Sequence, residues 1–336
     1  MMRDALCLFP EELAGILAET GQPAYRAEQI FSWLAKGAKS FAEMTNLSQN
    51  LRTELSGRLD IGVPEELRRQ VSRDGTRKIL WGFADGQTCE SVIMQYGGEF
   101  SVCVSSQAGC RQGCAFCASA KGGLVRSLTA GEILAQVLHC SVNAGHVVLM
   151  GMGEPLDNFD EVVRFLRLVN HPKGRGLGLR HVSLSTCGLV PEILRLADLG
   201  LPVTLSVSLH APDDETRSRL MPVNKKYGVG ELMEACKKYF EKTGRRNSYE
   251  YVMIEGMNDS AGQARLLAGL LRGQPAHVNL IPLNPVDGRD WKPSPPEAVR
   301  AFEQVLSGKG IAVTVRRRLG ADIDAACGQL RRRSMV

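Results

Sequence analysis

The sequence predicts an α/β protein built around a parallel β-sheet. Three observations support this fold class. From about residue 100 to residue 317, apolar strand-like runs alternate with amphipathic helical runs, which is typical of β/α units. Polar residues follow the predicted strands, and a separate helical segment occupies residues 1–62. Six β/α units and a final strand could form either a doubly wound sheet or an incomplete (β/α) barrel.

The first 62 residues predict a small helical domain. Apolar residues recur at helical spacing over residues 10–21, 27–37 and 48–59, and Gly21 and Gly37 end the first two runs. From about residue 66 the pattern changes to strand-like runs separated by DG, DG and GG turns. These features predict a β meander that leads into the main domain.

Six strand–helix pairs are predicted in the remainder of the chain. The first strand is FSVCVSS, and the helix after it begins with a capping box formed by Thr129 and Glu132. The later strands are predicted at residues 145–151, 180–188, 201–210, 247–256, 277–284 and 311–317. The later helices are predicted at residues 160–169, 191–200, 230–244, 261–273 and 295–310.

Polar residues able to do chemistry occur just after these strands. In a (β/α) barrel such positions meet at one face, where active sites are found. We therefore expect a single mouth that collects the following residues: Cys110 to Cys117, Glu154, Ser185, His210, Glu255, Asn258, Asn284, Asp322, Asp324 and Cys327.

Composition narrows the class of protein. The hydrophobic fraction of 44% is ordinary for a soluble domain, and no run of 18 apolar residues predicts a membrane span. The N-terminus has acidic residues within its apolar run, so we expect no signal peptide. Ten cysteines without a secretory signal favour a reducing, cytoplasmic compartment over a disulfide framework.

The net charge of +5 permits a polyanionic partner without demanding one. Basic residues gather in the C-terminal third of the chain, where a nucleic-acid surface is a reasonable hypothesis beside that of ordinary solvated surface. The clusters are Arg316–Arg318, Arg331–Arg333, Lys225 with Lys226, and Arg245 with Arg246.

The stretch GCRQGCAFC, at residues 109–117, carries the most specific chemistry. Its cysteines, Cys110, Cys114 and Cys117, are spaced C-x₃-C-x₂-C, with no fourth cysteine or histidine nearby. A structural zinc site needs four ligands, whereas three thiolates suit a [4Fe-4S] cluster with one iron left open. Phe116 would shield such a cluster from water. The alternative is three buried free thiols.

The motif C-x₃-C-x-aromatic-C resembles that of the radical S-adenosylmethionine (SAM) superfamily. The resemblance implies that the open iron binds SAM, and that one electron cleaves SAM to methionine and a 5′-deoxyadenosyl radical. It also implies a full or partial (β/α) barrel, so we expect a partial (β/α)₆ barrel. The stretch GMGEP, at residues 151–155, resembles the glycine-rich segment that holds SAM in this superfamily.

The stretches CVSSQAGC, GMGEPLDN, SLSTCG, SVSLHAPDDETR, PVNKKY, YEYVMIEGMNDS, VNLIPLNP and DIDAACGQL resemble the RlmN/Cfr-type RNA adenine methyltransferases. The resemblance runs from about residue 5 to residue 333 and is nearer the RlmN branch. It implies an RNA-binding accessory domain at 1–62, a β linker at 63–95 and the barrel at 96–333. It also implies methylation of adenine C2 in 23S rRNA and tRNA; the Cfr branch methylates C8 instead.

The same resemblance implies a role for individual residues. Cys327 would carry a methyl group from a first SAM, Cys103 would form a transient disulfide with Cys327, and Glu90 would accept a proton. Two SAM molecules would be used per turnover, with an electron donor such as flavodoxin or ferredoxin, and the enzyme would be a monomer. SAM contacts are implied for Gly153, Glu154, Ser185, Ser208, Leu209, His210 and Asn284.

Five other cysteines, Cys7, Cys89, Cys140, Cys187 and Cys236, are expected to be structural, because buried free thiols are usually inert. An iron–sulfur electron-transfer or sensing protein is the rival hypothesis. The missing fourth cysteine ligand and the pair Cys103 and Cys327 argue against that rival.

Overall fold

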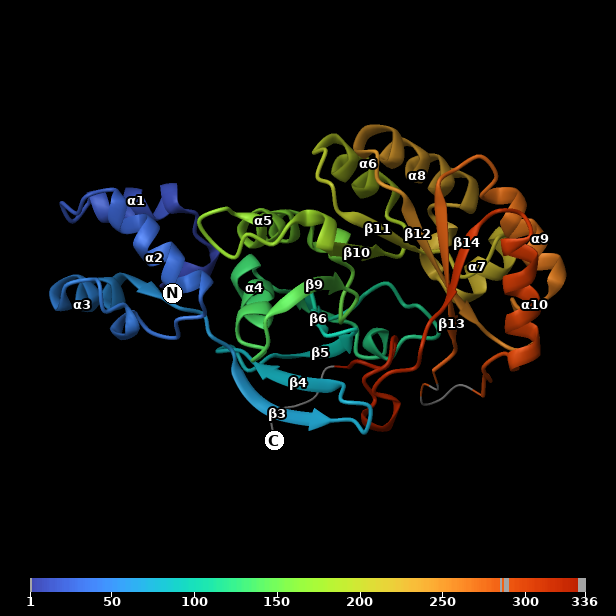
Figure 1. Ribbon diagram of the computed structural model, residues 1–336, viewed down its shortest axis with the longest axis horizontal. Coiled ribbons are helices and arrows are strands. Elements are labelled where there is room, and N and C mark those ends of the chain that lie inside the picture. Colours follow the sequence, from blue (N-terminus) through green and yellow to red (C-terminus); the bar gives the residue numbers. More distant parts are fainter. Residues whose placement is uncertain (1, 285, 287–289, 332–336) are drawn as a thin grey trace.

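A computed structural model gives the structure of residues 2–284, 286 and 290–331. In Figure 1 the N-terminal helices form one end of an elongated molecule, and the parallel strands with their helices form the other. Arg332 and Arg333 of the last basic cluster, and with them the predicted end of the barrel at residue 333, lie outside the described residues.

The three predicted N-terminal helices are confirmed as α1 (Pro10–Ala18), α2 (Tyr25–Ala35) and α3 (Gln49–Arg58). The Ser48 side chain caps α3 by accepting a hydrogen bond from the Leu51 amide at 3.3 Å. A parallel pair that the sequence did not predict, β1 (Arg3–Asp4) and β2 (Leu59–Asp60), joins the two ends of this unit.

Ten strands form one continuous sheet in the order β14-β13-β12-β11-β10-β9-β6-β5-β4-β3. The strands from β6 to β14 are parallel neighbours, and β3 to β6 form the predicted antiparallel meander. Their bounds are β3 Glu65–Val71, β4 Arg77–Gly82, β5 Thr88–Tyr96, β6 Glu99–Cys103, β9 Ala144–Leu149, β10 Val182–Thr186, β11 Thr204–Ser208, β12 Asn247–Met253, β13 Ala276–Pro282 and β14 Ala312–Val315.

The meander therefore extends the barrel sheet rather than forming a sheet of its own. The division of the chain at residues 62 and 95 stays a prediction.

Helices follow the parallel strands and lie on the outside of the curved sheet (Figure 1). They are α4 (Ala130–Leu138), α5 (Phe159–Asn170), α6 (Val190–Asp198), α7 (Asp214–Leu220), α8 (Val229–Thr243), α9 (Ala261–Leu270) and α10 (Pro296–Ser307). The capping box at Thr129 and Glu132 is present at the start of α4. The fold is thus the predicted partial (β/α)₆ barrel, with α7 as a helix that the sequence did not predict.

Short elements complete the chain. A hairpin of β7 (Gln107–Gly109) and β8 (Leu124–Ser127) brackets the three-cysteine segment. Single turns of 3₁₀ helix occupy η1 Ala5–Cys7, η2 Phe41–Glu43, η3 Ala118–Ala120, η4 Pro155–Asn158, η5 Leu179–His181, η6 Pro222–Lys225 and η7 Ala321–Ile323. Within the described part of the chain, no helix is both long and apolar enough to cross a lipid bilayer.

Three contacts fix the helical unit to the barrel. The Gly131 amide of α4 donates to the Cys7 sulfur at 3.1 Å, and Arg164 of α5 donates to the Cys7 carbonyl at 2.6 Å. Arg164 also forms an ion pair with Glu12 of α1. The start of the chain is thereby held against the first two barrel helices.

Candidate active site

A cavity of about 150 Å³ opens at the carboxyl ends of the parallel strands. Its walls come from the three-cysteine segment, from the ends of β9 to β13 and from the segment after β14. We call it the cysteine cavity. The predicted site residues that line it are Cys110, Cys114, Cys117, Gly153, Glu154, Ser185, Ser208, His210, Asn284 and Cys327.

The loop that carries the three cysteines is fixed by backbone hydrogen bonds. The Cys110 amide donates to the Gly123 carbonyl at 3.0 Å, and the Ala115 amide donates to the Leu220 carbonyl at the end of α7 at 2.9 Å. Gly109 has φ of 86°, and a side chain there would collide with the Gly123 carbonyl. The tight turn at Gly109 is therefore open only to glycine.

The three thiols are unpaired; Cys110 is buried, and Cys114 and Cys117 are partly exposed. Burial raises the pKa of Cys110 to about 12 and raises the pKa values of Cys114 and Cys117 as well. Over the described ranges, no three His, Cys, Asp or Glu side chains converge as a site for a single metal ion. Thiols spread around one cavity instead suit a multi-iron cluster, in which each thiolate binds a different iron.

The stretch after β9 lies directly against β6 and β7. Gly153 has φ of 105°, and a side chain there would approach the Gln107 Cβ and the Ser106 Oγ to 2.7 Å. Glu154 is buried and accepts hydrogen bonds from the Leu156 amide at 3.1 Å and the Cys187 amide at 2.7 Å. Burial raises the pKa of Glu154, and these amides oppose the rise.

His210 closes β11 in a strained conformation, with φ of 60°. Its Nδ1 accepts a hydrogen bond from the Val252 amide at 2.9 Å, so the hydrogen of the neutral ring is on Nε2. The ring packs edge-on against Phe116 at 4.6 Å between centroids. Burial lowers the pKa of His210 to about 3, which keeps the ring neutral. The next residue back, Leu209, is buried and does not line the cavity.

Arg217 of α7 joins the strand ends and was missed by the sequence analysis. The side chain is fully buried and donates to the carbonyls of Cys187 at 2.6 Å, Ser208 at 3.2 Å and Leu209 at 3.1 Å. It also donates to the Asn224 Oδ1 at 2.8 Å. The available signal was the DDETR stretch, in which Asp213 caps α7 through the Thr216 amide.

Cys327 enters the cavity from the segment after β14. The Asn284 amide group donates to the Cys327 carbonyl at 3.0 Å, and Arg318 donates to the Asn284 Oδ1 at 3.1 Å. The Ala118 amide, next to Cys117, donates to the Gly328 carbonyl at 2.7 Å. The cysteine loop and the Cys327 segment are thus directly joined.

Cys103 and Glu90 lie behind this cavity, on β6 and β5, and neither lines it. Burial raises the pKa of Cys103 to about 12; the charge of Cys327 adds to the rise and that of Arg316 opposes it. Glu90 is buried and accepts a hydrogen bond from the Arg331 amide at 3.0 Å, and its Oε1 lies 3.4 Å from the Lys78 Nζ.

Four of the polar residues expected at the mouth are not there. Asp322 accepts hydrogen bonds from the Ser72 hydroxyl at 2.5 Å and the Arg73 amide at 3.2 Å, and the Asp324 carbonyl accepts from Lys78. Asn258 is buried, and its side-chain amide group donates hydrogen bonds to the His210 and Val252 carbonyls. Glu255 is exposed. That part of the prediction was wrong because Glu255 and Asn258 do not line the cavity, and residues 322–324 contact β4 and the turn between β3 and β4 before the chain reaches the cavity at Cys327.

Fold and site together define a radical SAM enzyme, and the comparison with protein families agrees. Residues 104–265 match the radical SAM superfamily, and residues 6–61 match the ribosomal RNA large subunit methyltransferase N-terminal domain. The superfamily implies SAM and a [4Fe-4S] cluster, which three unpaired thiols around one cavity fit.

Curated relatives identify the family. A protein of Symbiobacterium thermophilum named probable dual-specificity RNA methyltransferase RlmN is 50% identical, over 96% of this chain and 90% of its own length. A protein of the same name from Alkaliphilus oremlandii is 48% identical, over 99% of this chain and 98% of its own. The chain therefore belongs to the RlmN family of radical SAM RNA methyltransferases.

A solved structure shows the same architecture. The crystal structure of a radical SAM methyltransferase from Sphaerobacter thermophilus superposes with a TM-score of 0.94 at 44% sequence identity. The match covers 98% of this chain and 99% of that one.

Proposed function

We propose that this enzyme methylates C2 of an adenine in 23S rRNA and in tRNA through a methyl group carried on Cys327. The observation that carries the proposal is the shared cavity: Cys327 lines the same space as Cys110, Cys114 and Cys117. Adenine C2 has no lone pair with which to displace a methyl group from SAM, so a radical route is needed. A cluster held by the three thiolates would supply, with SAM, the deoxyadenosyl radical that takes a hydrogen from the methyl group.

The chain's own residues account for the other steps. The Cys327 thiolate takes a methyl group from a first SAM, which leaves as S-adenosylhomocysteine. After loss of a hydrogen atom, the resulting carbon radical on Cys327 bonds to adenine C2. The adduct then loses the C2 proton to Glu90 and one electron, which would return to the oxidised cluster and so replace the electron used to cleave the second SAM.

Product release uses the second cysteine. The Cys103 thiolate attacks the Cys327 sulfur, the carbon–sulfur bond breaks, and the freed carbon takes a proton to become the methyl group. A disulfide between Cys103 and Cys327 remains for an external reductant. The positions of Cys103 on β6 and Glu90 on β5, against the segment that carries Cys327, support these roles.

The proposed reaction also requires an electron donor and SAM. Flavodoxin or ferredoxin would supply the electron, two SAM molecules would be used per turnover, and the enzyme would act as a monomer. The ten cysteines, all free in the structure, suit the reducing cytoplasm. Gly153, Glu154, Ser185, Ser208, His210 and Asn284 would contact SAM, and Leu209 would act only through its backbone.

The test is the mass of the peptide that carries Cys327, after incubation of the protein with SAM. We expect a gain of one methylene mass that Cys327→Ala abolishes. Cys187→Ala is the matched control, because Cys187 lines the same cavity and has no assigned role. Cys103→Ala is expected to leave RNA covalently attached to the enzyme.

An unmethylated Cys327 in protein that cleaves SAM under dithionite would refute the cysteine route. Failure to cleave SAM at all would favour an iron–sulfur sensor. Nucleoside analysis of the RNA product distinguishes methylation at C2 from the alternative at C8.

A further inference from the structure

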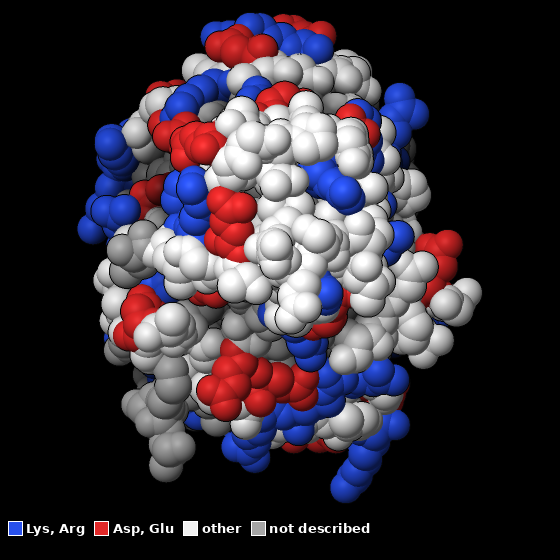
Figure 2. All heavy atoms as spheres, turned by 90° about the vertical axis from the view of Figure 1, so that its left-hand side faces the viewer, with Lys and Arg blue, Asp and Glu red and all other residues white. Residues whose placement is uncertain are grey.

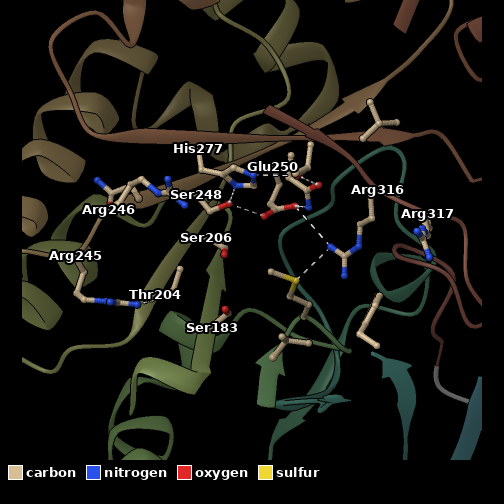
Figure 3. Close-up of a pocket in the computed structure, with 17 residues that line it drawn as sticks. Ser183, Thr204, Ser206, Arg245, Arg246, Ser248, Glu250, His277, Arg316 and Arg317 are labelled. Atoms are coloured by element: carbon tan, nitrogen blue, oxygen red, sulfur yellow. Dashed lines mark hydrogen bonds and ion pairs between the residues drawn. The ribbon is translucent and has the colours of Figure 1, made fainter. Parts of the chain in front are cut away.

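A second, larger cavity of about 660 Å³ occupies the open side of the barrel, toward the amino ends of β10 to β13 and beside β14 (Figure 3). We call it the polar trough. The interior of a (β/α) barrel is normally filled by layers of branched apolar side chains. Here the strands instead present small polar residues to the interior, among them Ser183, Thr204, Ser206, Ser248, Asn279 and Thr314. The sequence therefore builds a hollow that the stability of the fold does not require.

The trough is rimmed by positive charge. Figure 3 shows Arg245 and Arg246 at one side and Arg316 and Arg317 at the other. Arg246 and Arg317 are exposed. Arg245 donates to the Thr204 hydroxyl at 2.9 Å, but its buried Nε has no hydrogen-bond partner among the described residues. The exposed guanidinium groups of Arg246 and Arg317 can donate hydrogen bonds to an acceptor from outside, so the rim suits an anionic ligand.

Glu250 is the acidic side chain among the described residues that line the trough, and its charge is already engaged. It accepts hydrogen bonds from the Asn279 amide at 2.7 Å and the Ser248 hydroxyl at 3.2 Å, and it lies 3.7 Å from Arg316. The remaining three arginines thus give the trough a net positive charge, which favours an anionic ligand.

The trough adjoins the cysteine cavity. Met150, Glu250 and Arg316 line both spaces, and the Arg316 Nη1 lies 3.6 Å from the Met150 sulfur. A ligand group that passes these three side chains reaches the space that Cys327 lines. The open side and the exposed arginines of the polar trough allow the rest of a long ligand to continue outside the protein.

We propose that the polar trough is the entrance for RNA: backbone phosphates beside the target lie against Arg245, Arg246 and Arg317, and the target nucleotide passes the Met150–Glu250–Arg316 junction. This inference rests on the proposed function. An enzyme that acts on a base must take that base out of its stack, and a trough of this volume can accept a nucleotide. Serine and threonine hydroxyls are suitable partners for ribose and phosphate oxygens.

The outer face of the helical unit carries charges of both signs. In Figure 2, Lys and Arg side chains on that face are interspersed with Asp and Glu side chains. The positive charge of the trough is less offset, which favours it as the place where the RNA backbone is held next to the target.

The test is RNA binding by the cluster-loaded full chain, with Arg246→Ala, Arg317→Ala and the double variant. The probe is a fluorescein-labelled single-stranded RNA with one central adenine, titrated across a series of salt concentrations. Loss of each phosphate contact should lower the slope of log affinity against log salt by about 0.7. The double variant should bind about tenfold more weakly at low salt. Arg265→Ala, an exposed arginine on the outer helix α9, is the matched control and should bind like the wild type.

Wild-type affinity and slope in the double variant would overturn the proposal, as would an equal loss in Arg265→Ala. Displacement of the RNA by inorganic phosphate or ATP at sub-millimolar concentration would make the trough a small-phosphate site and also overturn it. SAM cleavage and methylation of Cys327 need no RNA, so they are measured on the same samples. Their failure in the wild type counts against the proposed function, whereas their persistence in variants that bind RNA weakly supports the trough.

Discussion

At the scale of the single residue, Arg217 holds the floor of the cysteine cavity. Its guanidinium supplies hydrogen bonds to three buried carbonyls from the ends of β10 and β11. In Arg217→Met these acceptors lose their partner in a site closed to water. We expect the free energy of unfolding in urea to fall by about 3–5 kcal/mol.

The matched control is Arg219→Met, which changes an exposed arginine on the same helix and should shift stability by less than about 0.5 kcal/mol. Arg217→Lys keeps the charge but cannot reach all the acceptors, so it should fall between the two. Equal stability of the Arg217 and Arg219 methionine variants would show that the hydrogen bonds do not hold the strand ends together.

Residues in recognisable motifs could be predicted from the sequence. Residues whose role depends on tertiary contacts could not. Cys110, Cys114 and Cys117 were found because three thiols at that spacing have few other uses. Arg217 was missed because a buried arginine looks like a surface one until its burial is known. Asp322 was misplaced because its partner, Ser72, is distant in sequence and sits in a turn that the pattern of residues does not link to it.

At the scale of elements, the helical unit and α4 can pack closely only because Gly131 has no side chain. A Cβ added to Gly131 would collide with the Asp4 carboxylate and approach the Cys7 sulfur to 2.9 Å. Gly131→Ala should therefore lower the free energy of unfolding by about 1–3 kcal/mol, through displacement of residues 4–7. Hydrogen exchange should show α1 and α2 losing protection first.

Gly230→Ala serves as the control, since Gly230 is in α8 with nothing within 4 Å of the added carbon. There alanine should stabilise by about 0.5–1 kcal/mol through helix propensity. A Gly131→Ala protein as stable as the wild type would mean that the junction has room that the structure does not show.

The same junction should respond to pH through His139, the residue that ends α4. Gly37 of the helical unit lies beside its ring, and burial together with the Lys39 charge lowers the pKa of His139 to about 4, against an opposing effect of Glu43. Because the unfolded chain takes up the proton near pH 6.5, this contribution to stability is complete above that pH and is lost as pH falls toward 4. At pH 5 the loss should be about 2 kcal/mol.

Urea unfolding at pH 7.5 and pH 5 measures this effect. His139→Gln should lose about 2 kcal/mol less than the wild type between the two values. His181→Gln, at an exposed position, should retain the full pH dependence. An unchanged pH dependence in His139→Gln would assign the acid sensitivity to other groups.

Elements with a long periodic pattern were predictable from the sequence, and short or non-local ones were not. Each helix of nine or more residues that the structure describes follows an apolar pattern at helical spacing. The three-residue β7 and the seven-residue α7 are too short for such a pattern. The joining of the meander to the barrel depends on β6, which pairs with β5 on one side and with β9 on the other. Pairing of β6 with β9 connects residues more than 40 positions apart, which no local pattern encodes.

At the scale of the whole molecule, the meander has a purpose beyond extending the sheet: it holds the chain segment that carries Cys327. After β14 the segment returns across the ends of β3 to β5 (Figure 1). Lys78 of β4 donates to the Asp324 carbonyl at 3.1 Å, and Glu90 of β5 accepts from the Arg331 amide. The Cys327 segment is thus positioned by residues about 240 positions earlier in the chain.

The turn between β3 and β4 contacts the segment that carries Cys327 through Asp74. Loss of the Asp74 carboxylate should therefore make Cys327 more accessible. The Asp74 carboxylate accepts hydrogen bonds from the Gly320 amide at 2.8 Å and the Thr76 amide at 2.9 Å, and these bonds contribute to lowering the pKa of Asp74 to about 2. The carboxylate is therefore charged throughout the neutral range. In Asp74→Ala we expect iodoacetamide to label Cys327 about five- to tenfold faster, because local opening of residues 320–331 loses one of its restraints.

Mass spectrometry of the labelled peptide over time gives the rate, and the yield of methylated Cys327 should fall in parallel. Asp74→Asn retains an oxygen acceptor and should lie nearer the wild type. The control is Asp198→Ala, which breaks an exposed ion pair with Lys242 far from this segment and should leave the rate unchanged. If Asp74→Ala labels at the wild-type rate, the position of Cys327 is set by the cysteine loop and Asn284 alone, and the meander is only the edge of the sheet.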